Sequence, residues 1–326
     1  MPNGLVLGID AGTSLVEAVC ATTDGEVVGR GRSGSANAMV LPVAEVVAHL
    51  SSAARQALSA VDPEQITVVV VGAAGMLRFT RGAAVGPLAG VWRSSGLTCP
   101  VRVLADAVTA FAAGTPHGHG SVLIADIGAI AARIGAEEVL ERVDGNGWLV
   151  GDDGSGFWLG RQAVRAVFAE LDHRGDPTLL TEAVLATLTG DDSVPTDPAE
   201  RVLLLRDTVY DGPPIALAGL ARLVPAAAEA GDRVAQRIVD RAVTLLVDSA
   251  TSLTADDPDE PLVLAGSLLS EDGPIGREVQ RRLASHHRAD PLLAGSCAGA
   301  AAWLAACSVT SHIDPVAHAR LTAPRM

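Results

Sequence analysis

Apolar residues along the chain fall into two recurring patterns, short buried runs and longer stretches with helical periodicity. The first pattern is typical of a buried strand, and the second is typical of an amphipathic helix. The strand-like runs are residues 5–9, 15–22, 27–31, 66–71, 101–104, 122–125, 130–134, 139–143 and 262–265. Helical periodicity covers residues 43–58, 155–171 and 216–253, with a further helix expected from about Ala107. Because the two patterns alternate, the sequence predicts an α/β protein whose sheets are covered by helices.

One pattern of three strands occurs twice. In the first copy, a strand leads into Asp10-Ala11-Gly12, and Asp24-Gly25 marks a hairpin between the second and third strands. In the second copy, a strand leads into Asp126-Ile127-Gly128, and two further strands follow. The Asp-x-Gly turns align when the copies are superposed. A duplication explains this alignment, and chance similarity of two hairpins is the alternative.

The repeat divides the chain into two lobes. Residues 1–116 are expected to form the N-terminal lobe, which the segment 310–326 could join, and residues 117–309 the C-terminal lobe. The boundary is placed near residues 114–120, and residues 190–200, rich in Asp, Pro and Thr, are expected to form a surface loop.

Composition excludes several classes of protein. With 48% hydrophobic and 19% charged residues, the chain is globular rather than disordered. A net charge of -14 argues against nucleic acid as a partner. No apolar run is long enough to cross a bilayer, and the N-terminus has no signal-peptide pattern, so a cytoplasmic location is expected. The four scattered cysteines fit reduced thiols there.

The chain contains no lysine, and its 24 basic residues are all arginine. This excludes a GKS/GKT phosphate loop, the lysine of a protein kinase, and a lysine Schiff base. A nucleotide phosphate would therefore have to be held by backbone amides and a metal ion.

The Asp-x-Gly turns have the chemistry for that task. In a tight turn containing glycine, backbone N–H groups converge on an anion, and Gly12 leaves room for a phosphate to approach. Thr13 and Ser14 add hydroxyl donors, and Asp10 can hold a hydrated Mg²⁺. A lone Asp-x-Gly-Thr is a simple hairpin about as often as it is a phosphate-binding turn. The phosphate-binding interpretation therefore depends on the repeat.

Several motifs in one order resemble those of the actin, Hsp70 and sugar-kinase superfamily. They are residues 8–14 (GIDAGTS), 105–107 (ADA), 125–131 (ADIGAIA), 147–160 (GWLVGDDGSGFWLG), 264–267 (LAGS) and the Gly/Ala-rich stretch 290–301. Within that superfamily the chain resembles the branch of the BadF/BadG ATPases and N-acetylglucosamine kinases, above all actinobacterial glucosamine kinases. The stretch 147–160 is the most specific match, to the family's GWLLGDEGSGYWLG.

The resemblance implies a duplicated ribonuclease H-like, actin-like ATPase fold with two lobes and a central ligand cleft. It also implies ATP and Mg²⁺ as cofactors, a small sugar as substrate and a homodimer. The implied ATP-binding residues are Asp10, Gly12, Thr13, Ser14, Asp126, Gly128, Ala129, Gly266 and Ser267, with Asp10 and Asp126 on the metal. The implied sugar-binding residues are Asn37, Asp106, Gly147, Trp148, Asp152 and Asp153, with Asp106 as the general base.

Simpler roles compete with several of these assignments. Asp106 and the pair Asp152 and Asp153 could cap the helices that follow them. Asn37 could support a turn, and Trp148 could belong to the core.

Three positions depart from the family's pattern. Asp126-Ile127-Gly128 stands where the family usually has Gly-Thr-Gly, which adds a carboxylate near the phosphates. Asn146 replaces a tryptophan close to the sugar, which disfavours N-acetylglucosamine. Ser267 replaces a glycine in the adenosine motif.

The sequence therefore predicts an ATP-dependent kinase that phosphorylates the 6-hydroxyl of an amino sugar, with glucosamine favoured over N-acetylglucosamine. Two alternatives remain open. One is an ATPase activator of the BadF type, which needs cysteine ligands for a cluster at a dimer interface. The other is a sugar sensor with weak or no catalysis.

Overall fold

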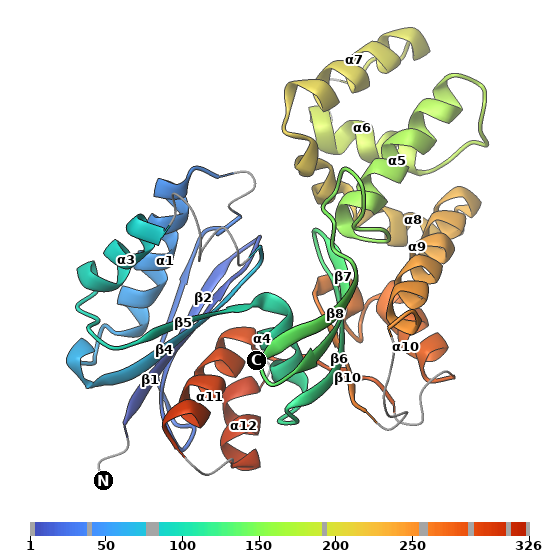
Figure 1. The fold of residues 1–326 in the computed structure, drawn as a ribbon. Coiled ribbons are helices and arrows are strands. Elements are labelled where there is room, and N and C mark those ends of the chain that lie inside the picture. Colours follow the sequence, from blue (N-terminus) through green and yellow to red (C-terminus); the bar gives the residue numbers. More distant parts are fainter. Residues whose placement is uncertain are drawn as a thin grey trace.

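The computed structural model describes residues 4–37, 41–75, 85–190, 194–253, 260–285, 290–310 and 314–323. Two five-stranded sheets form its centre (Figure 1), in the orders β3-β2-β1-β4-β5 and β10-β9-β6-β7-β8. The strands of the first sheet are β1 (Leu5–Ala11), β2 (Val16–Thr22), β3 (Val27–Ser33), β4 (Ile66–Ala73) and β5 (Val101–Ala105). Those of the second are β6 (His119–Ala125), β7 (Ala129–Gly135), β8 (Glu138–Asp144), β9 (Leu262–Ala265) and β10 (Leu292–Leu293).

The two sheets have the same topology, which confirms the duplicated α/β fold. Three antiparallel strands, β1-β2-β3 in one sheet and β6-β7-β8 in the other, are extended by two parallel strands. Asp10 lies at the end of β1, and Asp126 directly follows the equivalent strand β6. The turn at Asp24-Gly25 joins β2 to β3, with Gly25 at φ +90°.

Helices cover both sheets. They are α1 (Val43–Ala57), α3 (Val85–Ser94), α4 (Asp106–Gly114), α5 (Gly156–Leu171), α6 (Leu180–Thr189), α7 (Pro198–Asp211), α8 (Leu223–Glu229), α9 (Arg233–Thr251), α10 (Pro274–Leu283), α11 (Cys297–Val309) and α12 (Pro315–Thr322). Single helical turns of the 3₁₀ type occur at Pro63–Gln65 and Ser267–Leu269, and a longer one at Pro214–Leu220.

Three sequence-based expectations about helices were wrong. The periodic stretch 216–253 is not one helix, because Gly231 takes φ +91° and the Asp232 side chain caps a new helix, α9. The expected loop 190–200 gives way to α7 at Pro198, where the Asp197 carboxylate accepts two backbone N–H groups. In the Gly/Ala-rich stretch 290–301, which resembles the family's closing helix, the helix starts only at Cys297, after the strand β10.

Two helices, α4 and α11, lie between the sheets and exchange partners (Figure 1). Helix α4 follows a strand of the first sheet but also packs on β6 and β9 of the second. Helix α11 follows the second sheet but packs on β1 and β4 of the first. The approach is closest at Gly8, where a Cβ atom would stand 2.1 Å from the backbone nitrogen of Ala302. The lobe division predicted from the sequence assigns α11 to the C-terminal lobe; it stays a prediction.

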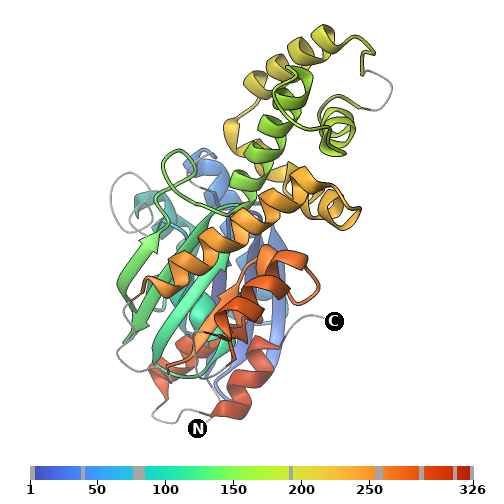
Figure 2. The ribbon, with the colours of Figure 1, turned by 90° about the vertical axis from the view of Figure 1, so that its right-hand side faces the viewer.

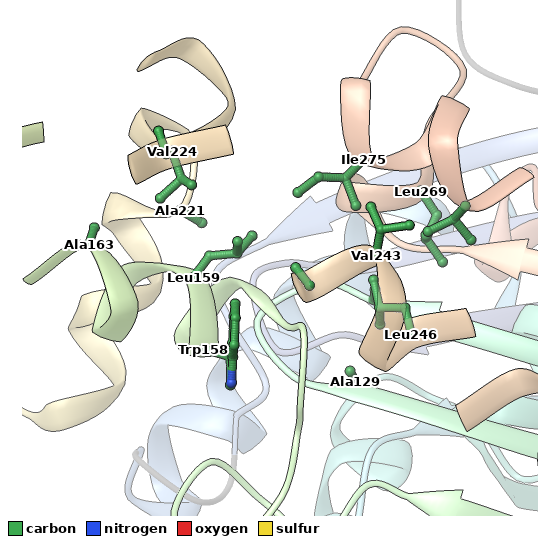
Figure 3. Close-up of a cluster of buried hydrophobic side chains, with 14 of the residues drawn as sticks. Ala129, Trp158, Leu159, Ala163, Ala221, Val224, Val243, Leu246, Leu269 and Ile275 are labelled. Atoms are coloured by element: carbon green, nitrogen blue, oxygen red, sulfur yellow. The ribbon is translucent and has the colours of Figure 1, made fainter. Parts of the chain in front are cut away.

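The remaining helices extend the second lobe. Helices α5, α6 and α7 project beyond the sheets (Figure 2), and a buried apolar cluster joins them to α8, α9 and α10. Leu159 in the first turn of α5 is fully buried in this cluster, together with Val243 and Leu246 of α9 (Figure 3). The start of α5, where the acidic motif ends, is therefore held by a packed core.

Candidate active site

The first Asp-x-Gly turn is closed against the loop that follows β3. The Gly12 carbonyl accepts a hydrogen bond from the backbone N–H of Ala36 at 2.9 Å, and the Ser35 hydroxyl donates to the Thr13 carbonyl at 2.6 Å. A Cβ atom on Gly12 would stand 2.6 Å from the Leu15 carbonyl oxygen. This turn therefore requires glycine at position 12, and it brings the loop with Asn37 next to the phosphate-binding candidate.

The second Asp-x-Gly turn is closed against the start of α5. The backbone N–H groups of Gly156 and Phe157 donate to the carbonyls of Asp126 and Ile127, at 2.7 and 3.1 Å. A Cβ atom on Gly156 would stand 3.0 Å from the Asp126 carbonyl. The Ser155 hydroxyl caps the helix by accepting from the Trp158 backbone N–H. Capping by Ser155 means that Asp152 and Asp153 are not needed for that role.

Two of the aspartates that the sequence singled out in separate motifs, Asp106 and Asp126, act electrostatically on the third, Asp10. Burial is the largest cause of a rise in the pKa of Asp10 to about 7, and the charges of Asp106, Glu17 and Asp126 raise it further. Glu17 faces Asp10 across the β1–β2 pair and forms an ion pair with Arg32 at 2.9 Å. The end of β1 is thus the centre of a group of four carboxylates.

Asp106 is the first residue of α4, between the two sheets. Its carboxylate accepts a hydrogen bond from the Ala107 backbone N–H at 2.9 Å, whereas the N-cap residue of α4 is Ala105, which makes no side-chain capping hydrogen bond. Burial nevertheless raises the pKa of Asp106, with that hydrogen bond acting in the opposite direction. A partly buried carboxyl group with a raised pKa is a suitable general base.

Cys297 occupies the position in α11 that Asp106 occupies in α4, the first residue of a helix lying between the sheets. The pKa of its thiol is raised well above its ordinary value, mainly by burial and further by the charges of Asp10 and Asp106. Burial and these neighbouring charges favour the protonated thiol, and no motif in the sequence indicated that Cys297 would lie near these aspartates.

The acidic loop between β8 and α5 is organised by Asp144, which the sequence analysis missed. The Asp144 carboxylate accepts backbone N–H groups from Asp152 at 2.8 Å and Asp153 at 2.7 Å. Its backbone is in the left-handed region, at φ 62°, where aspartate is one of the better tolerated residues. An aspartate directly before Gly145 at the end of a strand is a turn signal that could have identified it.

Asp152 connects the acidic loop to the second Asp-x-Gly turn. Its carboxylate accepts the Gly147 backbone N–H at 3.3 Å and a hydrogen bond from the Ala129 backbone. A Cβ atom on Gly128 would stand 2.9 Å from the Asp152 carboxylate oxygen. Burial raises the pKa of Asp152, whose own backbone is strained at φ 56°. The sugar-binding candidate and the phosphate-binding candidate are therefore in direct contact.

The adenosine-motif candidates adjoin the same turn. Gly266, at φ +95°, lies so close to the end of β6 that a Cβ atom would stand 2.3 Å from the Ala125 carbonyl oxygen. The Ser267 hydroxyl donates a hydrogen bond to the Asp126 carboxylate. Two residues that depart from the family's pattern thus contact each other.

The other predicted sugar ligands lie on both lobes. Asn37, on the loop after β3, donates its backbone N–H to the Ser35 hydroxyl, and Ser14 is exposed in the neighbouring turn. Trp148, in the acidic loop, packs at a tilt on Phe157 with ring centroids 5.2 Å apart. This contact fits the core-like alternative for Trp148, and its role in sugar binding stays a prediction.

The residues at the first turn fit a divalent cation bound with phosphate. The charges of Asp106, Glu17 and Asp126 disfavour ionisation of Asp10, and a cation placed among these carboxylates would offset that repulsion. Within the described part of the chain, no three His, Cys, Asp or Glu side chains are close enough to hold a metal alone. Mg²⁺ usually keeps several waters and takes one or two carboxylates plus phosphate oxygens, which matches this arrangement.

The fold and the paired turns define the class as an actin-like ATPase with two lobes. Residues 7–291 match the model of the BadF/BadG/BcrA/BcrD ATPase family, and the chain belongs to that family. None of the described helices is both long and apolar enough to span a membrane.

Among curated relatives, the N-acetylmuramic acid/N-acetylglucosamine kinase of Clostridium acetobutylicum is 28% identical over 182 residues, 55% of this chain and 58% of that protein. The match thus spans less than two thirds of that relative. The N-acetyl-D-glucosamine kinase of Dictyostelium discoideum is 24% identical over 91% of this chain and 95% of its own. A candidate N-acetylglucosamine kinase of known structure from Chromobacterium violaceum is 20% identical, with a TM-score of 0.69 over 93% of this chain and 99% of its own.

Proposed function

We propose that this protein transfers the terminal phosphoryl group of ATP to the 6-hydroxyl of an amino sugar, with glucosamine preferred to N-acetylglucosamine. The curated relatives are sugar kinases by name, which supports phosphoryl transfer to a small sugar. The observation that carries the proposal is the group of carboxylates in which Asp106, at the start of α4, interacts with Asp10 at the first phosphate turn. A base and a metal-binding carboxylate within electrostatic reach of each other are what this reaction requires.

Asp106 is the proposed general base. It accepts the proton of the sugar hydroxyl as that oxygen attacks phosphorus. Its raised pKa makes it a stronger base than an exposed aspartate, and its place on a helix between the lobes fixes its direction. Phosphoryl transfer depends mainly on positioning and charge neutralisation, so this rigid placement is the larger contribution.

Asp10 and Asp126 are the proposed metal-binding residues. Mg²⁺, when bound, neutralises negative charge on the phosphates during transfer. The two glycine turns supply backbone N–H groups to the phosphates, and Gly266 with Ser267 borders the nucleoside. Because the chain has no lysine, the proposal gives backbone dipoles and the metal the role of carrying positive charge near the phosphates.

The acidic loop supports the preference for a free amine. Asp144, Asp152 and Asp153 meet in one short segment, and Asp153 is exposed. Such a surface attracts an ammonium group, and it gains nothing from a neutral acetamide. Asn37 and Asp152 would bind ring hydroxyls, since an amide both donates and accepts while a carboxylate accepts twice.

A coupled assay for ADP release tests the proposal directly. Purified protein with Mg·ATP is incubated with glucosamine, N-acetylglucosamine, N-acetylmuramic acid, mannosamine and glucose, and kcat/KM is compared. Glucosamine is expected to give the highest value. Highest activity on N-acetylglucosamine would overturn the proposed preference for glucosamine but not the proposed kinase activity. ADP release that no sugar stimulates would overturn the proposed kinase activity itself.

The same preparation separates the two alternatives. A BadF-type activator would contain iron and absorb visible light after anaerobic purification. A sensor would bind sugar, as measured by calorimetry, without releasing ADP. If the protein is the proposed kinase, it should not absorb visible light and should release ADP when sugar is added.

A further inference from the structure

A groove runs along the outer side of the second lobe between α5 and α9. Its volume is about 640 Å³, within the range of roughly 300–1,000 Å³ that is usual for small-molecule sites. The two helices contact each other, and Arg237 of α9 forms an ion pair with Asp176, just beyond α5, at 2.9 Å. The groove therefore lies along this helix pair, away from Asp10 and Asp106.

The lining of this groove combines apolar and basic residues. Trp158 and Ile238 are among the apolar lining residues, and four arginines line it as well: Arg165, Arg174, Arg237 and Arg241. Asp172 is the one acidic residue in the lining described by the structure. This excess of positive charge stands out because the whole chain carries a net charge of -14.

Two of the four arginines have no partner among the residues that the structure describes. Arg174 is paired with Asp172 at 2.7 Å, and Arg237 is paired with Asp176. Arg165 on α5 and Arg241 on α9 make neither a hydrogen bond nor an ion pair with any residue in the described ranges, and both are exposed. They line the groove from its two opposite helices, so an anion between them could engage both guanidinium groups.

We propose that the groove between α5 and α9 binds a small phosphate monoester. Guanidinium groups bind phosphate in a bidentate manner, and a monoester carries close to two negative charges at neutral pH. The apolar part of the lining suits the carbon skeleton of a metabolite. A long polyanion such as RNA is disfavoured, because the rest of this acidic protein would repel it.

The groove is connected to the candidate active site through the first turn of α5. Trp158 lines the groove, its backbone N–H is bound by the Ser155 hydroxyl, and Leu159 next to it points into the buried core (Figure 3). Gly156 in the same turn is bonded to Asp126. A ligand in the groove is therefore in contact with the element that closes the second phosphate turn.

Isothermal titration calorimetry with glucose 6-phosphate tests the proposal, with glucose as the neutral control. Titrations are made with and without saturating Mg·AMPPNP, which blocks the candidate nucleotide site. The test variant is Arg165→Gln/Arg241→Gln. The matched control is Arg206→Gln/Arg281→Gln, which removes the same charge from helices α7 and α10 outside the groove.

We expect glucose 6-phosphate to bind saturably both with and without Mg·AMPPNP. Its affinity should fall at least tenfold in the groove variant but less than twofold in the control variant. Circular dichroism verifies that both variants fold. No saturable binding to the native protein, or equal loss in both variants, would overturn the proposal. Tighter binding of an oligoglutamate peptide than of glucose 6-phosphate, lost in the groove variant, would reassign the groove to an acidic protein segment. None of these outcomes depends on whether the protein is a sugar kinase.

Discussion

The Ser267 hydroxyl donates a hydrogen bond to the Asp126 carboxylate, although the two residues are 141 positions apart in the chain. Each stands where the family usually has glycine, one in the second phosphate turn and one in the adenosine motif. A hydrogen bond to a carboxylate is about twice as strong as one between neutral groups. We infer that the two departures compensate each other, because the serine satisfies the extra carboxylate and links the two motifs.

A double-mutant cycle tests this compensation. Asp126→Gly and Ser267→Gly are each expected to weaken Mg·AMPPNP binding, and the double variant to be no weaker than the worse single variant. The coupling energy should be about 1 kcal/mol, as for other contacting pairs. Calorimetric Kd values for the four proteins measure it, and thermal unfolding verifies their stability. Additive effects would contradict a functional pair.

Asp106→Asn removes the proposed base while keeping its size and its place on α4. We expect kcat to fall by about 10²–10⁴-fold, the usual contribution of a general base. Sugar binding should change less than about threefold, because the amide still offers hydrogen bonds. The matched control is Asp211→Asn at the exposed end of α7. Near-normal turnover by Asp106→Asn would remove Asp106 from this role.

Much of the fold could be predicted from local pattern, and this success has a physical reason. Glycine turns and buried strand runs are local, so the duplicated hairpins ending at Asp10 and Asp126 were identified from the sequence, as was their topology. The exchange of α4 and α11 between the sheets could not be predicted, because helix packing depends on contacts such as Gly8 with Ala302 that are distant in sequence.

The candidate site shows the same division. Motif residues were identified from the sequence, whereas Glu17, Asp144 and Cys297 were missed. In the sequence, Glu17 looks like an ordinary polar residue on a strand. Only its pairing with Asp10 across β1 and β2 places its charge at the candidate site. Cys297 gains its environment from α11, which comes from the far end of the chain.

Stability should depend on pH through Asp10. In the folded protein without metal its pKa is raised from 3.8 to about 7. The folded state therefore keeps a proton that the unfolded state releases, so this group's contribution is complete below pH 3.8 and is lost as the pH rises through about 7. Asp10→Asn, which is neutral at every pH, should therefore exceed the native melting temperature only slightly at pH 5 and by several degrees at pH 8.

The comparison requires EDTA in the buffer, since bound Mg²⁺ would favour the charged carboxylate and remove the difference. Asp211→Asn again serves as the control and should show no change between the two pH values. Differential scanning calorimetry at pH 5 and pH 8 provides the measurement. If Asp10→Asn is less stable than the native protein at pH 8, repulsion among the four carboxylates is not the dominant effect at this site.

Gly128→Ala adds a single methyl group and tests whether sugar binding can be weakened without weakening ATP binding. The backbone of Gly128 lies outside the left-handed region, so alanine is not excluded by conformation. The new Cβ atom would instead stand 2.9 Å from the Asp152 carboxylate oxygen and 3.3 Å from its carbon, which is closer than ordinary contact. Asp152 must then move, and its hydrogen bond from Gly147 lengthens. We expect KM for the sugar to rise about tenfold, while KM for ATP changes less than threefold.

Gly219→Ala is the matched control, because no atom lies within 4 Å of a Cβ atom placed there. Asp152→Asn gives the reference for losing the charge without the displacement. A larger effect of Gly128→Ala on KM for ATP than on KM for the sugar would mean that the turn itself, rather than Asp152, moves to make room for the methyl group. The contact between these two residues would then be a consequence of the fold and not the link that aligns the acceptor with the phosphates.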